Sequence, residues 1–135
     1  RSAKMPDFYE IVIEADVVSK KNQYGQDKSG RRFKPKHIVE TEKLALSQIP
    51  AELCGLRLQH PTVEFWSFIP KKSWALDIDG VFTTLCDYLV KAQVIEDDCI
   101  RRFNGPKLFH PTQESERKKF IIRLYPQAIT YVKSV

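Results

Sequence analysis

The amino-acid sequence predicts an α+β fold: a single small domain with a mixed four-stranded sheet and two main helices, in the order β-α-β-α-β-β. A chain of 135 residues suits one domain built around one hydrophobic core. Short stretches rich in β-branched and aromatic residues alternate with two longer stretches in which apolar residues recur at helical intervals. We therefore expect one domain over residues 1–135.

The N-terminal half supplies the first strand and the first helix. The stretch Phe8–Val18 (FYEIVIEADVV) reads as a strand because of its β-branched and aromatic content. Residues Ser19–Pro35 contain glycines but no apolar period, which predicts a loop. Apolar spacing then predicts a helix over Lys36–Ile49, and Pro50 ends it.

The centre of the chain supplies a buried strand and the second helix. Prolines bound the strand predicted at Thr62–Ile69, and a short loop is expected over Lys71–Leu76. The helix predicted from Asp79 to Ala92 carries apolar residues at intervals of three, four and seven, as a buried helix face requires.

Two late strands complete the sheet. We predict them at Cys99–Asn104 and Phe120–Tyr125, with a long turn between them that Gly105, Pro106 and Pro111 indicate. Residues 1–7 and 127–135 are expected to be tails that are flexible or contact a dimer partner.

Positive charge is concentrated in one segment. From Ser19 to Lys36 there are seven basic residues and one acidic residue, Asp27, which leaves a charge of +6, whereas the whole chain carries +5. The remainder therefore sums to −1. A cationic segment indicates a polyanionic partner, and a solvated basic loop is the alternative explanation.

Two pairs of aspartates flank the second helix: Asp77 and Asp79 before it, Asp97 and Asp98 after it. Taken singly, they have ordinary explanations, since Asp79 could cap the helix and the later pair could be turn residues, although Asp77 is not needed for capping. Grouped carboxylates repel one another unless a cation lies between them, and such oxygen ligands suit Mg²⁺ or Mn²⁺. In a basic protein this combination favours metal-dependent hydrolysis of a phosphodiester.

The same stretch resembles a known family. The motifs LDID (76–79), LVKA (89–92) and DD (97–98) are similar to the signature of the RusA-like Holliday junction resolvases, which runs Asp-Leu-Asp-Asn, a helix ending in Lys-Ala, and an Asp-Asp pair. The 19 residues from Asp79 to Asp98 match the family spacing. The likeness extends more loosely over residues 9–125.

This resemblance implies a RusA-like fold and a metal-dependent endodeoxyribonuclease that acts as a homodimer on four-way (Holliday) or branched DNA junctions, in recombination and repair. It implies catalytic roles for Asp77, Asp79 and Asp98. It also implies a metal site for Mg²⁺, with Mn²⁺ as the alternative, made by these three aspartates together with Asp97.

Two positions depart from the family pattern. Gly80 stands where the family has Asn; because Gly disfavours a helix by up to ~1 kcal/mol relative to Ala, we expect it to allow another backbone segment to approach closely. Thr83 stands where the family has a functional lysine. Lys71 and Lys72, which precede the aspartates, are hypothesised to supply the missing charge.

The second helix also suggests a dimer. At ~1.5 Å per residue, a helix from Asp79 to Ala92 is about 20 Å long, and six extended residues back to Asp98 cover at most about 20 Å. Asp98 therefore barely reaches Asp79 within one chain. Two copies of the helix, packed antiparallel about a two-fold axis, would bring these ends together. The sequence thus predicts an isologous homodimer centred on this helix, with Asp98 of the partner subunit joining Asp77 and Asp79.

Basic and aromatic residues are candidates for DNA contact. The candidate phosphate contacts are Lys20, Lys21, Arg31, Arg32, Lys34, Lys36, Lys71, Lys72, Arg101 and Arg102. Tyr24, Phe33 and Trp74 lie among them and could stack on an exposed base, with packing at element boundaries as the alternative. The three histidines show no ligand spacing.

Other function classes fit the sequence less well. No apolar run is long enough to span a membrane, the polar N-terminus predicts no secretory signal, and three cysteines are expected to be reduced and buried; we therefore expect a cytoplasmic protein. A transferase that uses Asp-x-Asp is disfavoured because the chain is short and lacks a Gly-rich phosphate loop. The main alternative is a non-catalytic junction- or DNA-binding protein on the same fold, because of Thr83.

Overall fold

A mixed β-sheet forms the base of the molecule. The computed structural model describes residues 6–19, 24–59, 61–96 and 107–126. Four strands follow one another across the sheet in the order β1 (Tyr9–Ile13), β7 (Lys119–Tyr125), β4 (Thr62–Ile69) and β5 (Lys107–Phe109). Strand β7 is antiparallel to β1 and to β4, whereas β4 is parallel to β5 and to the two-residue strand β6 (Gln113–Glu114). The predicted α+β class with a mixed sheet is confirmed, but the sheet has five strands and not the predicted four.

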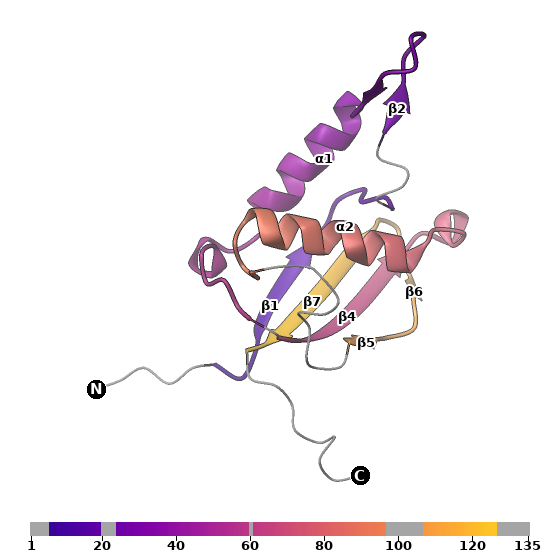
Figure 1. Ribbon diagram of the computed structural model, residues 1–135. Coiled ribbons are helices and arrows are strands. Elements are labelled where there is room, and N and C mark those ends of the chain that lie inside the picture. Colours follow the sequence, from indigo (N-terminus) through magenta and orange to yellow (C-terminus); the bar gives the residue numbers. More distant parts are fainter. Residues whose placement is uncertain (1–5, 20–23, 60, 97–106, 127–135) are drawn as a thin grey trace.

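Two helices lie on the same side of this sheet (Figure 1). Helix α2 (Ile78–Lys91) crosses the strands, and α1 (Lys36–Ser47) packs beside α2 through an ion pair of 2.7 Å between Glu42 and Lys91. Two short 3₁₀ helices, η2 (Ala51–Leu53) and η3 (Lys71–Ser73), follow α1 and β4. A proline precedes each of α1, η2 and η3, where the missing N–H is tolerated.

The core lies between α2 and one face of the sheet. Residues along β4 and β7 alternate between buried and partly exposed, as expected for strands with one covered face. The ring of Phe65 contacts those of Phe82, Phe109 and Phe120, with centroids 5.1 to 6.0 Å apart. Each large apolar side chain buried here stabilises the fold by roughly 1.5–3 kcal/mol relative to its exposed state.

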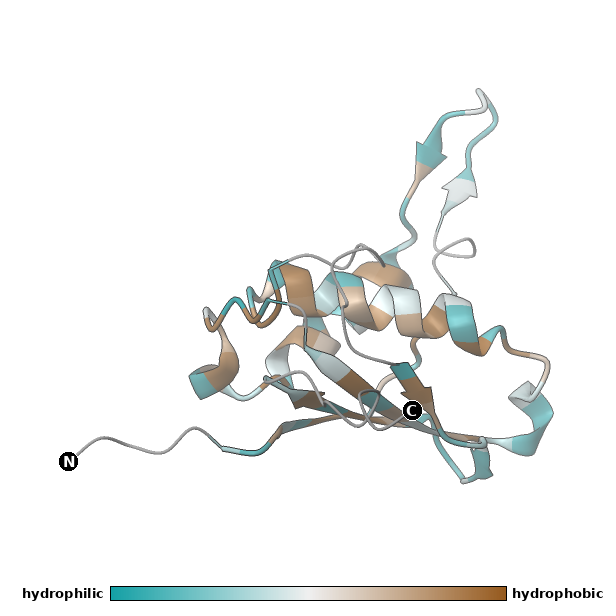
Figure 2. Cartoon of the chain, turned by 60° about the horizontal axis from the view of Figure 1, so that its bottom comes forward, coloured by the Kyte–Doolittle hydropathy of each residue, from teal (hydrophilic) through white to brown (hydrophobic). Residues whose placement is uncertain are grey.

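The opposite face of the sheet carries a stacked polar and aromatic cluster, and no helix of the described residues covers it (Figure 2). The His110 ring stacks on Trp66 at 4.4 Å, and the Arg123 guanidinium lies 5.0 Å from the Trp66 centroid. Glu64 accepts hydrogen bonds from Tyr125 and pairs with His110. His110 is therefore a partly exposed structural residue, in agreement with its lack of ligand spacing.

The long predicted elements are confirmed with shifted ends, and two regions were predicted wrongly. The expected loop over 19–35 contains a hairpin of β2 (Gly25–Gln26) and β3 (Arg32–Phe33). The expected turn between the two late strands contains β5 and β6. Strands of two or three residues are held by their neighbours and carry too little sequence pattern of their own. The strand predicted at 99–104 lies outside the described residues.

Two further expectations can be compared with the described residues. No helix among them combines the length and the apolar character that crossing a membrane requires. Cys86 is buried and unbridged as expected, whereas Cys54 is unbridged but exposed, so its predicted burial was wrong. Cys54 follows the short η2 helix, and its backbone bonds to that turn at the surface.

Candidate active site

The N-terminus of α2 presents two carboxylates to solvent. Asp77 is the N-cap: its extended backbone (ψ 99°) lets its Oδ1 accept a hydrogen bond of 3.2 Å from the Gly80 N–H. Asp79 lies in the first turn and is exposed. The helix begins one residue earlier than predicted, at Ile78, so the interpretations that Asp79 caps it and that Asp77 is not needed for capping were both wrong. Negative charge at this end is favoured by the helix dipole.

The segment after β1 lies against the same end of α2. Ser19 is only 1% exposed, and a Cβ at Gly80 would overlap its hydroxyl and stand 2.8 Å from Oδ2 of Asp77. The Thr84 hydroxyl donates to the carbonyl of Val18 at 2.9 Å and holds this segment in place. Gly80 thus permits a close approach, but the atoms nearest to it belong to the side chains of Ser19 and Asp77 and not to backbone, as had been expected. The basic segment of the chain thus begins beside Asp77.

Thr83 lies one turn after Asp79 on the exposed side of α2. Its hydroxyl donates to the backbone carbonyl of Asp79 at 3.0 Å, so the side chain is turned back onto its own helix. It adds no positive charge next to the carboxylates. The position that resembles the family lysine is therefore filled by a residue that serves the helix backbone.

Lys71 and Lys72 are exposed on η3, just before α2. The Trp74 indole donates to the Ile69 carbonyl at 3.0 Å and ties η3 to the end of β4. Lys72 lines a cavity of about 490 Å³ together with acidic and basic residues from the ends of β1 and β7, and neither Asp77 nor Asp79 is among its lining residues. The hypothesis that this lysine serves the carboxylates therefore requires its side chain to turn out of the cavity.

Six of the predicted site residues lie outside the described residues: Lys20, Lys21, Asp97, Asp98, Arg101 and Arg102. Their described neighbours can be placed. The Glu96 N–H donates to the Leu58 carbonyl, close to the C-terminus of α2. Lys107 lies with its Nζ 5.6 Å from the centroid of Phe82, one turn after Asp79. The described chain therefore stops near the C-terminus of α2 at Glu96 and resumes at Lys107, whose side chain lies near Phe82 in the N-terminal half of α2.

The described residues test the predicted metal site only in part. Among them, no group of three or more His, Cys, Asp and Glu side chains could hold a metal ion. Asp77 and Asp79 offer carboxylate oxygens, which suit a hard cation such as Mg²⁺, although one oxygen of Asp77 accepts from Gly80. Their chemistry fits the ion, and a complete site needs further oxygen ligands such as Asp97 and Asp98.

The basic segment forms a projecting β2–β3 hairpin beyond the end of α1 (Figure 1). Its turn is organised by Asp27, whose Oδ1 accepts hydrogen bonds from the Ser29 hydroxyl and from the N–H groups of Ser29 and Arg31. These bonds, led by that of the Ser29 hydroxyl, hold the pKa of Asp27 below its ordinary value. Gly30 completes the turn at φ +84°, a conformation that favours glycine.

The basic residues in and just after this hairpin differ in their exposure and in their ion pairs. Arg31 and Arg32 are exposed, and the Arg32 guanidinium lies 4.5 Å from the Tyr24 ring centroid. Lys34 is half-buried, and its Nζ lies 3.5 Å from Oε1 of Glu42, so this carboxylate partly neutralises the charge of the lysine. Lys36 is highly exposed and 3.9 Å from Glu40.

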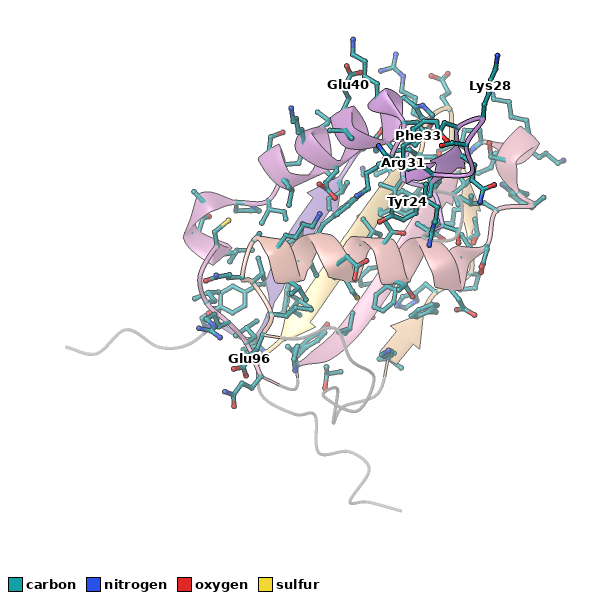
Figure 3. The ribbon with its side chains drawn as sticks, turned by 45° about the horizontal axis from the view of Figure 1, so that its top comes forward. Tyr24, Lys28, Arg31, Phe33, Glu40 and Glu96 are labelled. Atoms are coloured by element: carbon teal, nitrogen blue, oxygen red, sulfur yellow. The ribbon has the colours of Figure 1, made fainter. Side chains whose placement is uncertain are left out.

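Lys28, which was not among the predicted DNA contacts, points outward at the tip of the hairpin (Figure 3). Its place in the basic segment was the only sequence signal for such a role. Phe33 and Tyr24, predicted as stacking candidates, lie in the same hairpin and are each 45% exposed. Trp74, the third candidate, is 50% exposed on η3.

The apolar side of α2 is used within the chain. Val81, Phe82, Leu85 and Leu89 are buried, and so are Thr84, Cys86 and Tyr88, whereas the exposed strip runs through Thr83 and the half-buried Asp87 and Val90. The exposed strip of α2, along which the dimer interface is predicted, is therefore mostly polar.

Comparison of the chain with protein-family models and with curated proteins gives no match. The likeness to RusA-like resolvases remains a prediction from sequence motifs.

Proposed function

We propose that this protein is a metal-dependent endodeoxyribonuclease that cleaves phosphodiester bonds in four-way or branched DNA. One observation carries the proposal: the exposed carboxylates Asp77 and Asp79 stand at the point where the basic segment leaves the fold, next to Ser19. A negatively charged cation site adjoining a cationic surface suits a substrate whose backbone is a polyphosphate.

In this proposal Asp77, Asp79 and Asp98, with Asp97, hold Mg²⁺ or Mn²⁺. The cation, when bound, would activate water and neutralise charge on the phosphate. Asp97 and Asp98 lie outside the described residues, and their part in this site is taken from the motif spacing alone. Phosphate contacts come from the exposed cations, of which Arg31, Arg32, Lys36, Lys71 and Lys72 are described.

A homodimer acting in the cytoplasm in DNA recombination and repair is part of the same proposal. A four-way junction is roughly two-fold symmetric, and its resolution needs two opposed cuts, which a two-fold dimer can make with two equal sites. Mixing inactive Asp79→Asn and Asp98→Asn proteins tests whether sites are shared between subunits. If the mixture regains cleavage, the active sites are shared between subunits. If the subunits are shown to exchange and the mixture still does not cleave, each site lies within one chain.

The decisive experiment is cleavage of an end-labelled synthetic four-way junction with Mg²⁺, with Mn²⁺ or with EDTA. We expect symmetric nicks that require the metal and are lost in Asp79→Asn. Glu52→Gln is the matched control, because Glu52 is an exposed carboxylate in η2, close to the opposite end of α2. Cleavage by Asp79→Asn at the wild-type rate would overturn the proposal.

A second candidate is a non-catalytic protein that binds junctions. Thr83 favours it, since its hydroxyl is bonded to the helix backbone and the residue itself adds no cation beside Asp79. The same assay separates the two functions. Tight junction binding with no cuts in either metal supports the binding protein, whereas metal-dependent nicks support the nuclease.

A further inference from the structure

The β2–β3 hairpin contributes nothing to the hydrophobic core. Of residues 24–33, all but the half-buried Gly25 are exposed, and the hairpin extends away from the sheet and helices (Figure 1). An irregular loop in the same place would leave the hydrophobic core unchanged. Its conformation and its exposed aromatic rings therefore need another explanation.

The conformation of the hairpin is nevertheless well defined. Gly25 pairs with Phe33 and Gln26 with Arg32, and the Asp27 N–H donates to the Arg31 carbonyl at 3.1 Å. The three hydrogen bonds to the Asp27 carboxylate lock the turn. A projection with such a turn loses less conformational entropy on binding than a disordered loop would.

Phe33 is supported from one side by backbone. A Cβ at Gly25 would stand 2.9 Å from Cζ of Phe33, so the ring lies directly against the glycine. The ring nonetheless stays 45% exposed. The absence of a side chain at Gly25 thus lets the hairpin hold a flat aromatic surface in a fixed position at its exterior.

The charges around this ring indicate the partner. Lys28, Arg31 and Arg32 are exposed on the same hairpin, and the one acidic residue among residues 24–34, Asp27, is engaged by the turn. A protein surface with mixed charges would gain little from this arrangement. An anionic polymer with planar rings, that is, a nucleic acid with accessible base faces, matches both features.

We propose that the hairpin recognises the branch point of DNA, with Phe33 stacking on an unstacked base while Lys28, Arg31 and Arg32 contact the neighbouring phosphates. The proposal rests on DNA as the substrate and adds a recognition element that acts without the metal. Base faces are hidden in a continuous duplex and accessible at a branch point. Phe33 therefore discriminates between the two, whereas the cations bind both.

Equilibrium binding in EDTA tests this role without cleavage. Dissociation constants are measured for a four-way junction with 2-aminopurine at the branch point and for a duplex of matched sequence. We expect Phe33→Leu, which stays apolar but loses the flat ring, to bind the junction about tenfold more weakly and the duplex unchanged. Phe33→Trp is expected to retain junction binding and to quench 2-aminopurine.

Leu44→Ala serves as the control for removal of an exposed apolar side chain, since Leu44 is 48% exposed on α1. Circular dichroism checks that each variant is folded. If Phe33→Leu binds the junction as tightly as the wild type, the hairpin proposal is wrong while the nuclease proposal stands. If the wild type binds neither the junction nor the duplex, the hairpin proposal and the nuclease proposal are both wrong. If the wild type binds DNA and the variants behave as expected, but the protein never cuts the junction, only the nuclease proposal is wrong.

Discussion

The hydroxyl of Ser19 lies against the α-carbon of Gly80, in the space that a side chain at position 80 would fill. Rotating the hydroxyl does not relieve the overlap, because the Ser19 Cβ would also be only 2.8 Å from the added carbon. This contact joins the end of the β1 segment to the first turn of α2. It therefore fixes the start of the basic segment relative to Asp77.

Gly80→Ala is expected to destabilise the protein although alanine is the better helix former. Overpacking costs typically about 1–3 kcal/mol, and alanine returns up to ~1 kcal/mol of helix propensity. Urea unfolding followed by circular dichroism measures the difference. The double variant Ser19→Gly/Gly80→Ala should recover the part of the loss that Ser19 causes, while the 2.8 Å approach to Oδ2 of Asp77 remains. If Gly80→Ala were more stable than the wild type, by up to the ~1 kcal/mol of helix propensity, Ser19 would be shown to move aside freely.

Substitutions at Asp77 separate its structural role from its proposed metal role. Asparagine caps helices about as well as aspartate, so the free energy of unfolding of Asp77→Asn should lie within ~0.5 kcal/mol of the wild-type value. Asp77→Ala should be less stable than the wild type by about 1 kcal/mol. Both variants should lose junction cleavage, since both lack the carboxylate. Thermal and urea unfolding are compared with cleavage rates on the same preparations. If Asp77→Asn still cleaves the junction, Asp77 acts as a helix cap and not as a metal ligand.

The long elements could be predicted from sequence because each buries one face along its whole length. In β4 and β7 the alternation of buried and exposed residues follows the apolar pattern, and in α2 the spacing of Val81, Phe82, Leu85 and Leu89 does the same. Strands β5 and β6 could not be predicted, because parallel pairing with β4 holds them. That pairing depends on residues far apart in the chain.

The candidate site was predictable as a set of residue types and not as an arrangement. The sequence favours Asp79 over Asp77 as the cap of α2, and only the backbone conformation of Asp77 shows that Asp77 is the cap. The sequence predicts that Lys34 contacts phosphate, whereas in the fold its ammonium group lies beside Glu42 of α1. The exposed face of Phe33 likewise depends on the pairing of β2 with β3, which the short strands do not indicate on their own.

Glu42 links the hairpin, α1 and α2, and its charge should make stability depend on pH. Burial raises the pKa of Glu42, but hydrogen bonding and attraction to Lys91 and Lys34 outweigh it and leave the pKa below the ordinary 4.5. A lowered pKa in the folded state stabilises the protein above the unfolded value, and this contribution is lost as pH falls through the folded value. Stability should thus decline below about pH 4.5 less steeply in Glu42→Gln than in wild type.

The measurement is urea unfolding near neutral pH and at about pH 3, with Glu52→Gln as the control carboxylate variant. Glu52 is exposed, so its substitution should leave the acid dependence close to that of wild type. If Glu42→Gln and wild type lose stability in parallel as the pH falls, the ion pairs of Glu42 with Lys34 and Lys91 do not contribute measurably in solution.

Thr83→Lys should increase metal-dependent cleavage of a four-way junction. The position is exposed, one helical turn after Asp79, so a lysine there fits without repacking and places an ammonium group on the same side as that carboxylate. A cation there would contact the phosphate near the proposed metal. Thr83→Gln, which is long and uncharged, controls for the lost hydroxyl bond to the Asp79 carbonyl. Single-turnover rates should rise for lysine and not for glutamine; equal rates would show that this chain does not need the family's lysine.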